Sequence, residues 1–438
     1  MDDSSIVPAE DSGATVRPAA AHRTRLGFAL AVPCILFLAV ALPMSLLTPA
    51  MANNDEPDHV QYALFIETHA ALPTIGVENG DESHQPPLYY AALALEMKLI
   101  GVQHMTLSLT PDPSTATDVH LMRLPGILFG LITVMAAFGS AWLLTRRLSF
   151  SSAVASAVGL WPKFDVVSGA VSNETLNYTL CALALLCLLL WLRAERRQLL
   201  WASATGVLLG LAALTEFTSL PLAGLLLLLV IGVSASRRRW RDPVVAVAAF
   251  TAMSGWWFVR NMVLYGDPLA SAATRAYLAR LVPGLLCPCP GWLPGPALHR
   301  LLYSLWYDGG QNQLGLSWRV DVAVTVIAVL CLARGVWVLW MRRGGPERKI
   351  DLDLLALLLA AMGGIAAWFV IASSATQAEG RYLLVAVTAW CLLLVAGTDR
   401  IRVLGRNVGD ALVWAWPAGF AILDLYVFAK FVIPLGGW

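Results

Sequence analysis

Charged residues are scarce in this chain. Asp, Glu, Lys and Arg together make up 13% of its 438 residues, whereas hydrophobic residues make up 58%. A soluble protein usually carries about a quarter charged residues, so this composition excludes a soluble globular fold and indicates an integral membrane protein. The net charge is only +1. The basic residues form small separate clusters, which excludes a nucleic-acid-binding surface.

Cysteine is also rare. Of the 7 cysteines, all but two lie inside apolar runs, where small buried side chains are expected. The remaining pair, Cys287 and Cys289, lies in a loop and is too closely spaced for an ordinary disulfide. No second pair of Cys or His residues accompanies them at a zinc-ligand spacing. The sequence therefore predicts neither a metal site nor another cofactor.

Long apolar runs, in contrast, occur throughout the sequence. The first run is about 22 residues long and carries no charge, which is sufficient to cross a bilayer. The third run is short and is consistent with a broken helix. An all-α polytopic membrane protein with about eleven transmembrane helices is therefore predicted. The runs are Leu26–Leu47, Leu121–Leu144, Phe150–Pro162, Thr175–Leu192, Leu199–Leu214, Thr218–Val233, Pro243–Val263, Val320–Trp340, Leu352–Ile371, Tyr382–Gly397 and Ala411–Ile433.

The basic clusters predict the orientation of these helices. All of them fall on one side of the membrane if eleven helices are counted, and positive-inside bias makes that side cytoplasmic. The N-terminus is then cytoplasmic and the C-terminus extracytoplasmic. The clusters are His22–Arg25, Arg146–Arg147, Arg193–Arg197, Arg237–Arg241, Arg342–Lys349 and Arg400–Arg406.

The chain is predicted to form one transmembrane domain, residues 22–438, after a disordered cytoplasmic tail, residues 1–21. The tail is polar and rich in Pro and Ala, which is typical of disorder. Two large extracytoplasmic loops are expected, at residues 48–120 and 264–319.

The first of these loops contains the densest group of polar residues. An acidic cluster, Asn53–His59, directly follows the first span, and His84–Tyr90 comes some thirty residues later. Ionisable residues at membrane depth are costly and by default mark a functional site. Within this loop, Asp55–Leu72 and Pro86–Ile100 are predicted as short helices along the membrane surface.

At these residues the sequence resembles the GT-C superfamily of membrane glycosyltransferases. The superfamily includes protein O-mannosyltransferases and lipid A aminoarabinose transferases, and an actinobacterial-type branch is the most similar. The resemblance extends from residue 55 to residue 383, in the expected order and on one predicted membrane side. It rests on Asp55–Glu56, His84–Tyr90, Trp161–Asp165, Ser172–Glu174, Trp256–Asn261, Tyr265–Pro268 and Gln377–Leu383.

The resemblance implies a hexosyl- or pentosyltransferase of the bacterial cytoplasmic membrane and cell envelope. The expected reaction moves a sugar, with inversion, from a polyprenyl-phosphate donor to an acceptor hydroxyl on a glycan, lipid or secreted molecule. Asp55 and Glu56 are the expected catalytic carboxylates, because the acceptor hydroxyl must lose a proton. Three cations are expected to hold the donor phosphate, namely Arg381, Lys163 and Arg260. The expected substrate contacts are His84, Gln85, Tyr89, Asp165, Asn173 and Glu379.

Each of these residues also has a structural alternative. Asp55 is well placed to cap the helix that follows it, since Asp is a preferred N-cap residue. Arg381 and Lys163 are also typical of helix anchors that snorkel to the interface. Asp58 with His59 is an alternative binding group for a divalent cation.

Two functional alternatives remain open. Glu216 stands where related sequences often carry a lysine, which indicates either a different donor or an inactive relative. A transporter or polymerase of lipid-linked glycans has a similar number of spans. A transporter is expected to contain paired repeats, and no internal repeat is evident here. The sequence identifies neither the sugar, the acceptor, nor the oligomeric state.

Overall fold

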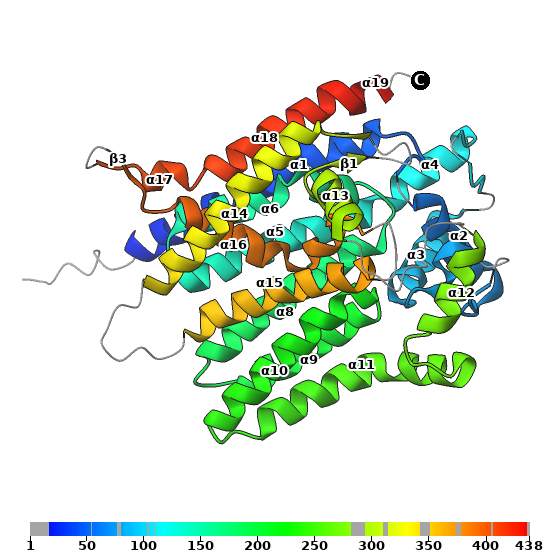
Figure 1. Ribbon diagram of the computed structural model, residues 1–438, viewed down its shortest axis with the longest axis horizontal. Coiled ribbons are helices and arrows are strands. Elements are labelled where there is room, and N and C mark those ends of the chain that lie inside the picture. The colour runs from blue at the N-terminus through cyan, green and yellow to red at the C-terminus, as the bar shows by residue number, and fades with distance from the viewer. Residues whose placement is uncertain are drawn as a thin grey trace, which may run out of the picture.

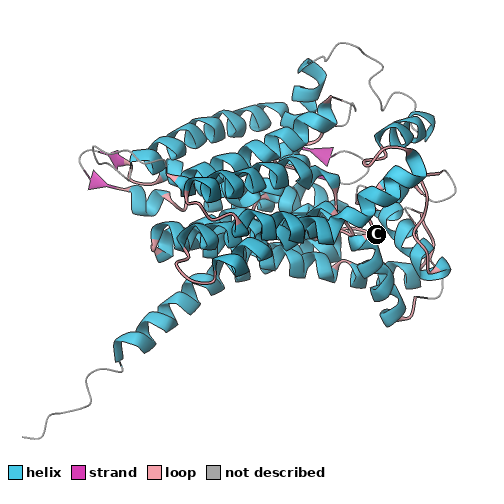
Figure 2. Ribbon diagram, turned by 90° about the horizontal axis from the view of Figure 1, so that it is seen from below, coloured by secondary structure: helices cyan, strands magenta, loops and turns pink. Residues whose placement is uncertain are grey.

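The computed structural model describes residues 17–53, 55–76, 80–102, 105–108, 110–281, 294–309, 314–341, 351–373, 378–403 and 406–435. In this part of the chain the fold is a bundle of long helices with a group of shorter helices at one end (Figures 1 and 2). Two short antiparallel hairpins, β1–β2 and β3–β4, complete it.

The elements follow one another in this order: α1 (Arg17–Leu47), α2 (Glu56–His69), η2 (Asp81–His84), α3 (Leu88–Ile100), α4 (Pro113–Met122), α5 (Leu124–Thr145), α6 (Leu148–Gly159), α7 (Pro162–Ser168), α8 (Asn173–Arg193), α9 (Gln198–Ala213), η3 (Phe217–Ser219), α10 (Leu220–Ser236), α11 (Arg241–Tyr265), α12 (Ser271–Leu281), α13 (Pro294–Leu305), β1 (Asp308–Gly309), β2 (Leu314–Gly315), α14 (Trp318–Met341), α15 (Leu352–Ala372), η4 (Gly380–Ala386), α16 (Val387–Thr398), β3 (Arg402–Val403), β4 (Arg406–Asn407), α17 (Gly409–Leu412), α18 (Ala415–Val427), η5 (Phe428–Val432) and α19 (Ile433–Leu435).

The predicted polytopic helical fold is confirmed. Among the described residues, 9 helical segments are long and apolar enough to cross a membrane. Two further apolar helices, α6 and α9, have 12 and 16 residues. Because these two are shorter than a bilayer-spanning helix normally is, the count of about eleven spans stays a prediction. The long segments are Thr24–Leu47, Pro113–Thr145, Asn173–Arg193, Phe217–Ser236, Arg241–Tyr265, Trp318–Met341, Leu352–Ala372, Gly380–Thr398 and Gly409–Val432.

Several predicted boundaries differ from the structure. Helix α1 begins at Arg17, so residues 17–21 of the predicted disordered tail are helical. The third apolar run is divided, because α6 ends at Gly159 and α7 begins at Pro162. Proline is favoured in the first turn of a helix, where its missing N–H has no partner to lose. Cys287, Cys289 and Gln377 lie outside the described residues.

Small residues allow the long helices to approach closely. Gly206 of α9 faces the carbonyl of Ala246 on α11, and Gly397 of α16 faces the carbonyl of Cys331 on α14. At both positions a Cβ atom would overlap the facing carbonyl oxygen. Close backbone approach through small residues is the usual means by which helices associate in lipid, where burial of apolar side chains gives little driving force.

The two helices predicted in the first loop are present as α2 and α3. Together with η2, α4 and α12 they form the group at one end of the bundle, and α17 and β3 lie at the opposite end (Figure 1). A separate small core holds this group together. In it the rings of Tyr62 and Tyr90 stack with centroids 4.0 Å apart, beside buried Met97 and Val119.

Candidate active site

Asp55 occupies the N-cap position of α2 but does not cap it. Its backbone is left-handed, with φ 59° and ψ 2°, and its side chain makes no capping hydrogen bond. The carboxylate instead accepts a hydrogen bond from Nη2 of Arg381 at 2.8 Å. Left-handed backbone is unfavourable for a residue other than glycine, and such strain is concentrated at functional sites. Asp55 thus occupies the N-cap position, but its side chain binds Arg381 and does not cap the helix.

Arg381 gathers three carboxylates from distant parts of the chain. Besides the bond to Asp55, its Nε lies 2.9 Å from Glu379 and 3.3 Å from Glu174. The guanidinium carbon lies 5.4 Å from the ring centroid of Tyr382. The Arg381 side chain is 13% exposed. One arginine at the start of η4 therefore joins the beginnings of α2 and α8.

Glu379 extends this network to α13. Its second oxygen accepts a hydrogen bond from Nη2 of Arg300 at 2.5 Å. The backbone N–H of Gly380 donates to the hydroxyl of Ser304 at 2.8 Å, which fixes α13 against η4. Burial alone would raise the pKa of Glu379, but Arg381 and Arg300 outweigh burial and hold it below its ordinary value.

Lys163 is buried with few partners. It stands in the first turn of α7 and is 2% exposed. Its Nζ donates to the backbone carbonyl of Asp308 at 2.9 Å, and among the described residues no carboxylate lies within ion-pair distance of it. A lysine ammonium has three N–H donors. At least one of these remains available for an anionic ligand.

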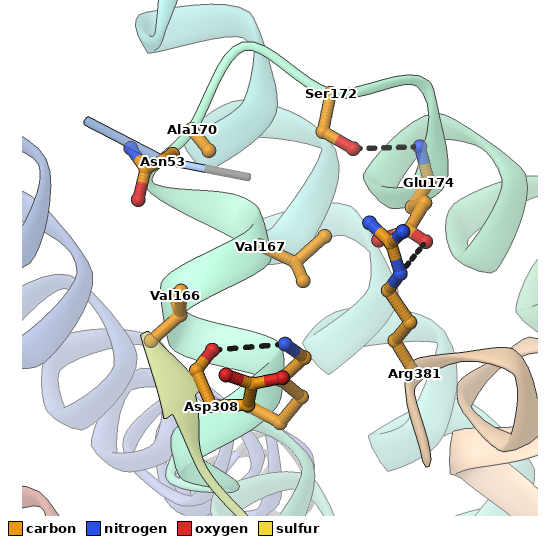
Figure 3. Close-up of a pocket in the computed structure, with 9 residues that line it drawn as sticks. Asn53, Val166, Val167, Ala170, Ser172, Glu174, Asp308 and Arg381 are labelled. Carbon is orange, nitrogen blue, oxygen red and sulfur yellow. Dashed lines mark hydrogen bonds and ion pairs between the residues drawn. The ribbon is translucent and has the colours of Figure 1, made fainter. Parts of the chain in front are cut away.

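Lys163 and Arg381 line the same pocket. Figure 3 shows Arg381 on this pocket beside Glu174. Its empty volume is about 290 Å³, including the open mouth. One wall is apolar and comes from α7 and the turn after it. The lining residues are Asn53, Lys163, Val166, Val167, Ala170, Ser172, Glu174, Asp308 and Arg381.

The two aspartates at the start of α2 differ in their pKa. Burial would raise the pKa of Asp55, but the charges of Arg381 and, to a lesser extent, His59 bring it below its ordinary value. Burial and the nearby charges of Asp81 and Asp55 raise the pKa of Asp58 to about 7. At neutral pH Asp55 is therefore ionised and able to accept a proton.

Glu56 lies outside the pocket, in a buried ion pair with Arg123. Both side chains are 0% exposed. Nε and Nη2 of Arg123 donate to the two Glu56 oxygens at 2.8 and 2.7 Å, and the N–H of Val171 donates to one of them at 3.0 Å. The remaining Arg123 donors bind the carbonyls of Ser45, Thr48 and Pro49. This position gives Glu56 a structural setting in place of the predicted catalytic one.

Arg260 also lies away from the pocket. Its Nη2 donates to the carbonyl of Pro73 at 2.7 Å, and its guanidinium carbon lies 4.7 Å from the ring centroid of Trp257. Nearby, the N–H of Ile75 donates to the hydroxyl of Tyr265 at 3.0 Å. The C-terminal end of α11 thus contacts the first loop, and the structure does not bring Arg260 to Lys163 and Arg381.

Three of the predicted substrate contacts lie in the group of short helices beside Asp55. Nδ1 of His84 donates to the carbonyl of Asp81 at 2.8 Å. The backbone carbonyl of Gln85 accepts from Tyr62 at 3.3 Å. Tyr89 is buried with its ring edge-on to His59. None of the three lines the pocket described above.

Of the other predicted contacts, Asn173 adjoins Glu174 and donates from Nδ2 to the carbonyl of Thr215 at 3.2 Å. Asp165 is 0% exposed and its carboxylate makes no hydrogen bond within the described residues. Burial and the nearby carboxyl of Asp424 raise its pKa well above the ordinary value. Asp165 is therefore buried in the bundle and does not line the pocket.

Glu216, which stands where related sequences often carry a lysine, lies near Glu174 but does not line the pocket. Its Oε2 accepts a hydrogen bond from Nδ2 of Asn177 at 3.0 Å, and the same amide donates to Thr218 at 3.1 Å. Burial and the nearby charge of Glu174 raise the pKa of Glu216 to about 7.

Several residues of the site were not predicted from the sequence. Glu174 and Asn53 belong to motifs that were recognised, but their neighbours were selected in their place. Asp308 and Arg300 lie in a long loop whose sequence gives no sign that it returns to the site. In the sequence, Arg123 lies near the start of the predicted run Leu121–Leu144 and resembles an ordinary interfacial arginine.

Comparison with known proteins identifies the fold. The family described as dolichyl-phosphate-mannose-protein mannosyltransferase matches residues 77–282. ArnT from Cupriavidus metallidurans, solved bound to undecaprenyl phosphate, is 15% identical with a TM-score of 0.50 over 92% of this chain and 73% of that one. The Archaeoglobus fulgidus oligosaccharyltransferase tethered to an acceptor peptide is 12% identical, with a TM-score of 0.53 over 94% of this chain and 55% of that one. No curated protein matches the sequence.

A third structure agrees with these two. The arabinofuranosyltransferase AftD from Mycobacteria is 19% identical, with a TM-score of 0.51 over 94% of this chain and 28% of that one. This chain is therefore a multi-pass membrane protein with the fold of the GT-C glycosyltransferases, and the resemblance found in the sequence is confirmed.

Proposed function

We propose that this protein is a glycosyltransferase that moves a sugar from a polyprenyl-phosphate donor to an acceptor hydroxyl. The observation that carries the proposal is the position of Lys163 and Arg381 on one pocket, with Asp55 bound to Arg381. Such a transfer needs cations for the phosphate and a carboxylate for the proton, and these residues supply both.

Asp55 is the proposed general base. The acceptor oxygen attacks the anomeric carbon, a new carbon–oxygen bond forms, and the hydroxyl proton passes to the Asp55 carboxylate. The bond between the anomeric carbon and the phosphate oxygen breaks in the same displacement, which inverts the anomeric centre. Because Arg381 keeps the pKa of Asp55 low, the carboxylate is ionised at neutral pH, and a donor phosphate that draws Arg381 away would make it a stronger base.

Lys163 and Arg381 stabilise the leaving group. The lipid phosphate gains negative charge as the bond breaks, and preorganised cations are most effective where charge develops. Lys163 is buried and has no carboxylate partner within the described residues. Arg381 has three carboxylate partners, and it offers the planar fork that matches phosphate oxygens. Two structures with this fold were solved in complex with undecaprenyl phosphate and with dolichol-phosphate, which supports a lipid phosphate here.

We place the pocket on the extracytoplasmic side of a bacterial cytoplasmic membrane. The basic clusters support this orientation, since β3 and α17 lie at the end of the bundle opposite α2, α3 and α12 (Figure 1). In intact cells, and in a background with Cys287 and Cys289 replaced by serine, a membrane-impermeant thiol label should react with a cysteine placed at Glu67 and spare one placed at Arg238. The reverse pattern would contradict the orientation.

Binding of undecaprenyl phosphate to the purified protein tests the proposed function. Wild type should bind the lipid, and Lys163→Ala should weaken binding about 10- to 100-fold, since a hydrogen bond to a charged group is worth about 1.5–3 kcal/mol. Arg260→Ala is the matched control, because Arg260 lies at the same end of the molecule but away from the pocket. Failure of wild type to bind, or equal affinity for Lys163→Ala and wild type, would overturn the proposal.

A further inference from the structure

An open apolar groove runs along the surface of the bundle between α10 and α11. Ile231 of α10, Trp240 of the intervening turn and residues of α11 from Pro243 to Ala252 line it. Ligand pockets usually hold about 300–1,000 Å³, and this groove has a volume of about 750 Å³. Because α11 lies at the edge of the bundle (Figure 1), the groove is on a face that meets lipid.

The groove is about as long as one leaflet of a bilayer is thick. From Pro243 to Ala252 an α-helix rises ~14 Å, at about 1.5 Å per residue. The hydrocarbon core is about 30 Å thick, so one leaflet contributes ~15 Å. Beyond Ala252 the exposed face of α11 carries the larger side chains of Trp256, Val259 and Met262. A transmembrane helix of a second copy would cross both leaflets, whereas the acyl chain of a lipid ends within its own leaflet.

Exposed arginines flank the groove at the turn between α10 and α11. The segment Arg237–Arg241 contains four arginines on either side of Trp240, and all four are exposed. The adjacent carboxylate, Asp242, is buried and accepts a hydrogen bond from Nε1 of Trp191 at 3.2 Å, and within the described part of the chain no carboxylate lies within ion-pair distance of these arginines. Their positive charge is therefore available to an anionic ligand.

We propose that the groove binds an anionic glycerophospholipid, with one acyl chain along α11 and the phosphate against the arginines of the turn. Basic pockets between transmembrane helices bind acidic lipid head groups, and arginine offers phosphate two parallel N–H donors. The turn lies at the end of the bundle that holds α17 and β3, away from α2 and α3 (Figure 1). In the orientation proposed above, the lipid belongs to the cytoplasmic leaflet. The site is separate from the candidate active site and does not depend on the proposed function.

Lipid binding by the purified full-length protein tests this site. The probes are phosphatidylglycerol and phosphatidylcholine with identical acyl chains, and native mass spectrometry in a neutral detergent measures the affinity for each. Wild type should bind phosphatidylglycerol about tenfold or more tightly than phosphatidylcholine. Arg237→Gln combined with Arg241→Gln should weaken phosphatidylglycerol binding about 30-fold, since each arginine beside an anionic lipid contributes about fivefold. Ala248→Trp fills the groove and should weaken the binding of both lipids.

Two matched controls separate this site from general surface charge and from general contact with lipid. Arg196→Gln combined with Arg197→Gln removes the same charge from the exposed turn between α8 and α9, which does not line the groove. Val263→Trp adds the same side chain as Ala248→Trp at an exposed position of α11 beyond the groove. Both controls should bind phosphatidylglycerol as wild type does. Gel filtration verifies folding, and the arginine and groove variants remain independent tests if one of them misfolds.

Several results would overturn the assignment. Equal affinity of wild type for the two lipids would show that the arginines select no head group. Unchanged phosphatidylglycerol affinity in Ala248→Trp, or an equal loss in the control that lacks Arg196 and Arg197, would show that the groove holds no lipid of its own. Displacement of phosphatidylglycerol by equimolar undecaprenyl phosphate would make the groove a site for polyprenyl lipids. Lipid-free dimers that form in wild type and dissociate in Ala248→Trp would make it an interface between two copies.

Discussion

Two buried arginines, Arg123 and Arg381, lie in regions of opposite character. The hydrogen-bond donors of Arg123 all have acceptors, because two carboxylate oxygens and three backbone carbonyls surround its guanidinium. Arg123 and its ion-pair partner Glu56 are both 0% exposed. Around Arg381 three carboxylates share one guanidinium, which is 13% exposed and lines a pocket. A buried charge whose partners are complete supports the fold, whereas unused hydrogen-bonding capacity beside a cavity indicates a ligand.

The dipeptide Asp55–Glu56 connects the two regions. Adjacent side chains at the start of α2 point to different partners, Asp55 to Arg381 and Glu56 to Arg123. The strained backbone at Asp55 lies next to the fully buried ion pair of Glu56 with Arg123. We infer that the Arg123 region holds Asp55 in its unfavourable conformation.

The largest expected effect separates these neighbouring carboxylates. Asp55→Asn keeps the side-chain shape but removes the proton acceptor, so transfer from a lipid-linked donor should fall about 10²- to 10⁴-fold. Glu56→Gln should retain more activity per folded molecule. The measurement is the transfer rate of purified variants at saturating donor concentration. Full activity in Asp55→Asn would remove its role as base, and continued lipid transport by that variant without glycosyl transfer would favour the transporter alternative.

The Arg123 region should matter more than Asp55 for the stability of the fold, which is the reverse of their effects on activity. Arg123→Ala leaves Glu56 buried without its cation, a change that typically costs about 3–5 kcal/mol. Asp55→Asn removes a partly exposed charge, so its unfolding temperature should stay close to that of wild type. Thermal unfolding in detergent, followed by tryptophan fluorescence, measures both variants. Equal unfolding temperatures for Arg123→Ala and wild type would contradict the supporting role of the Arg123 region.

The smallest expected effect is a pH dependence at Glu216, behind the site. Its pKa is raised to about 7 from an ordinary value of 4.5. As pH rises from about 4.5 to about 7, the unfolded chain loses this proton and the folded protein retains it, so the folded state loses stability across that window. Glu216→Gln lacks this proton and keeps an acceptor for Asn177.

The unfolding free energy of Glu216→Gln should therefore exceed that of wild type by an amount that grows over this window. It should level off above pH 7 at about 3 kcal/mol, because the pKa rises from 4.5 to about 7 and each pKa unit corresponds to about 1.4 kcal/mol. Unfolding in detergent at pH 5, 6, 7 and 8 measures the difference. A difference that does not change with pH would show that Glu216 does not titrate there.

The helical fold could be predicted from the sequence because lipid leaves few alternatives. A membrane-spanning segment must satisfy its own backbone hydrogen bonds, so an uncharged apolar run is read directly as a helix. The shorter helices α2 and α3 could be located from proline at the start of each and from the acidic residues in the first turn of α2. Asp55, Lys163, Glu379 and Arg381, which were predicted as site residues, lie close together in the structure, and they could be selected because charged residues near membrane depth are few.

The partners of those charges could not be predicted in the same way. Glu56 and Asp55 are chemically alike and adjacent, and only the left-handed backbone at Asp55 sends their side chains apart. Arg260 and Arg381 both stand near one end of a helix, yet one binds a loop carbonyl and the other binds three carboxylates. Local pattern contains no information on such contacts, because the residues involved are up to 326 positions apart.

The sequence by itself therefore determined the membrane-embedded helical fold, the polar end of the bundle and the set of ionisable residues from which a site could be built. The physical reason is the high cost of placing charge and unpaired backbone groups in lipid. Tertiary structure alone decided which charges became complete ion pairs and which were left facing a pocket. That division depends on how α7, α8, β1 and η4 meet, and small residues such as Gly380, packed against the backbone of Leu305, permit that approach.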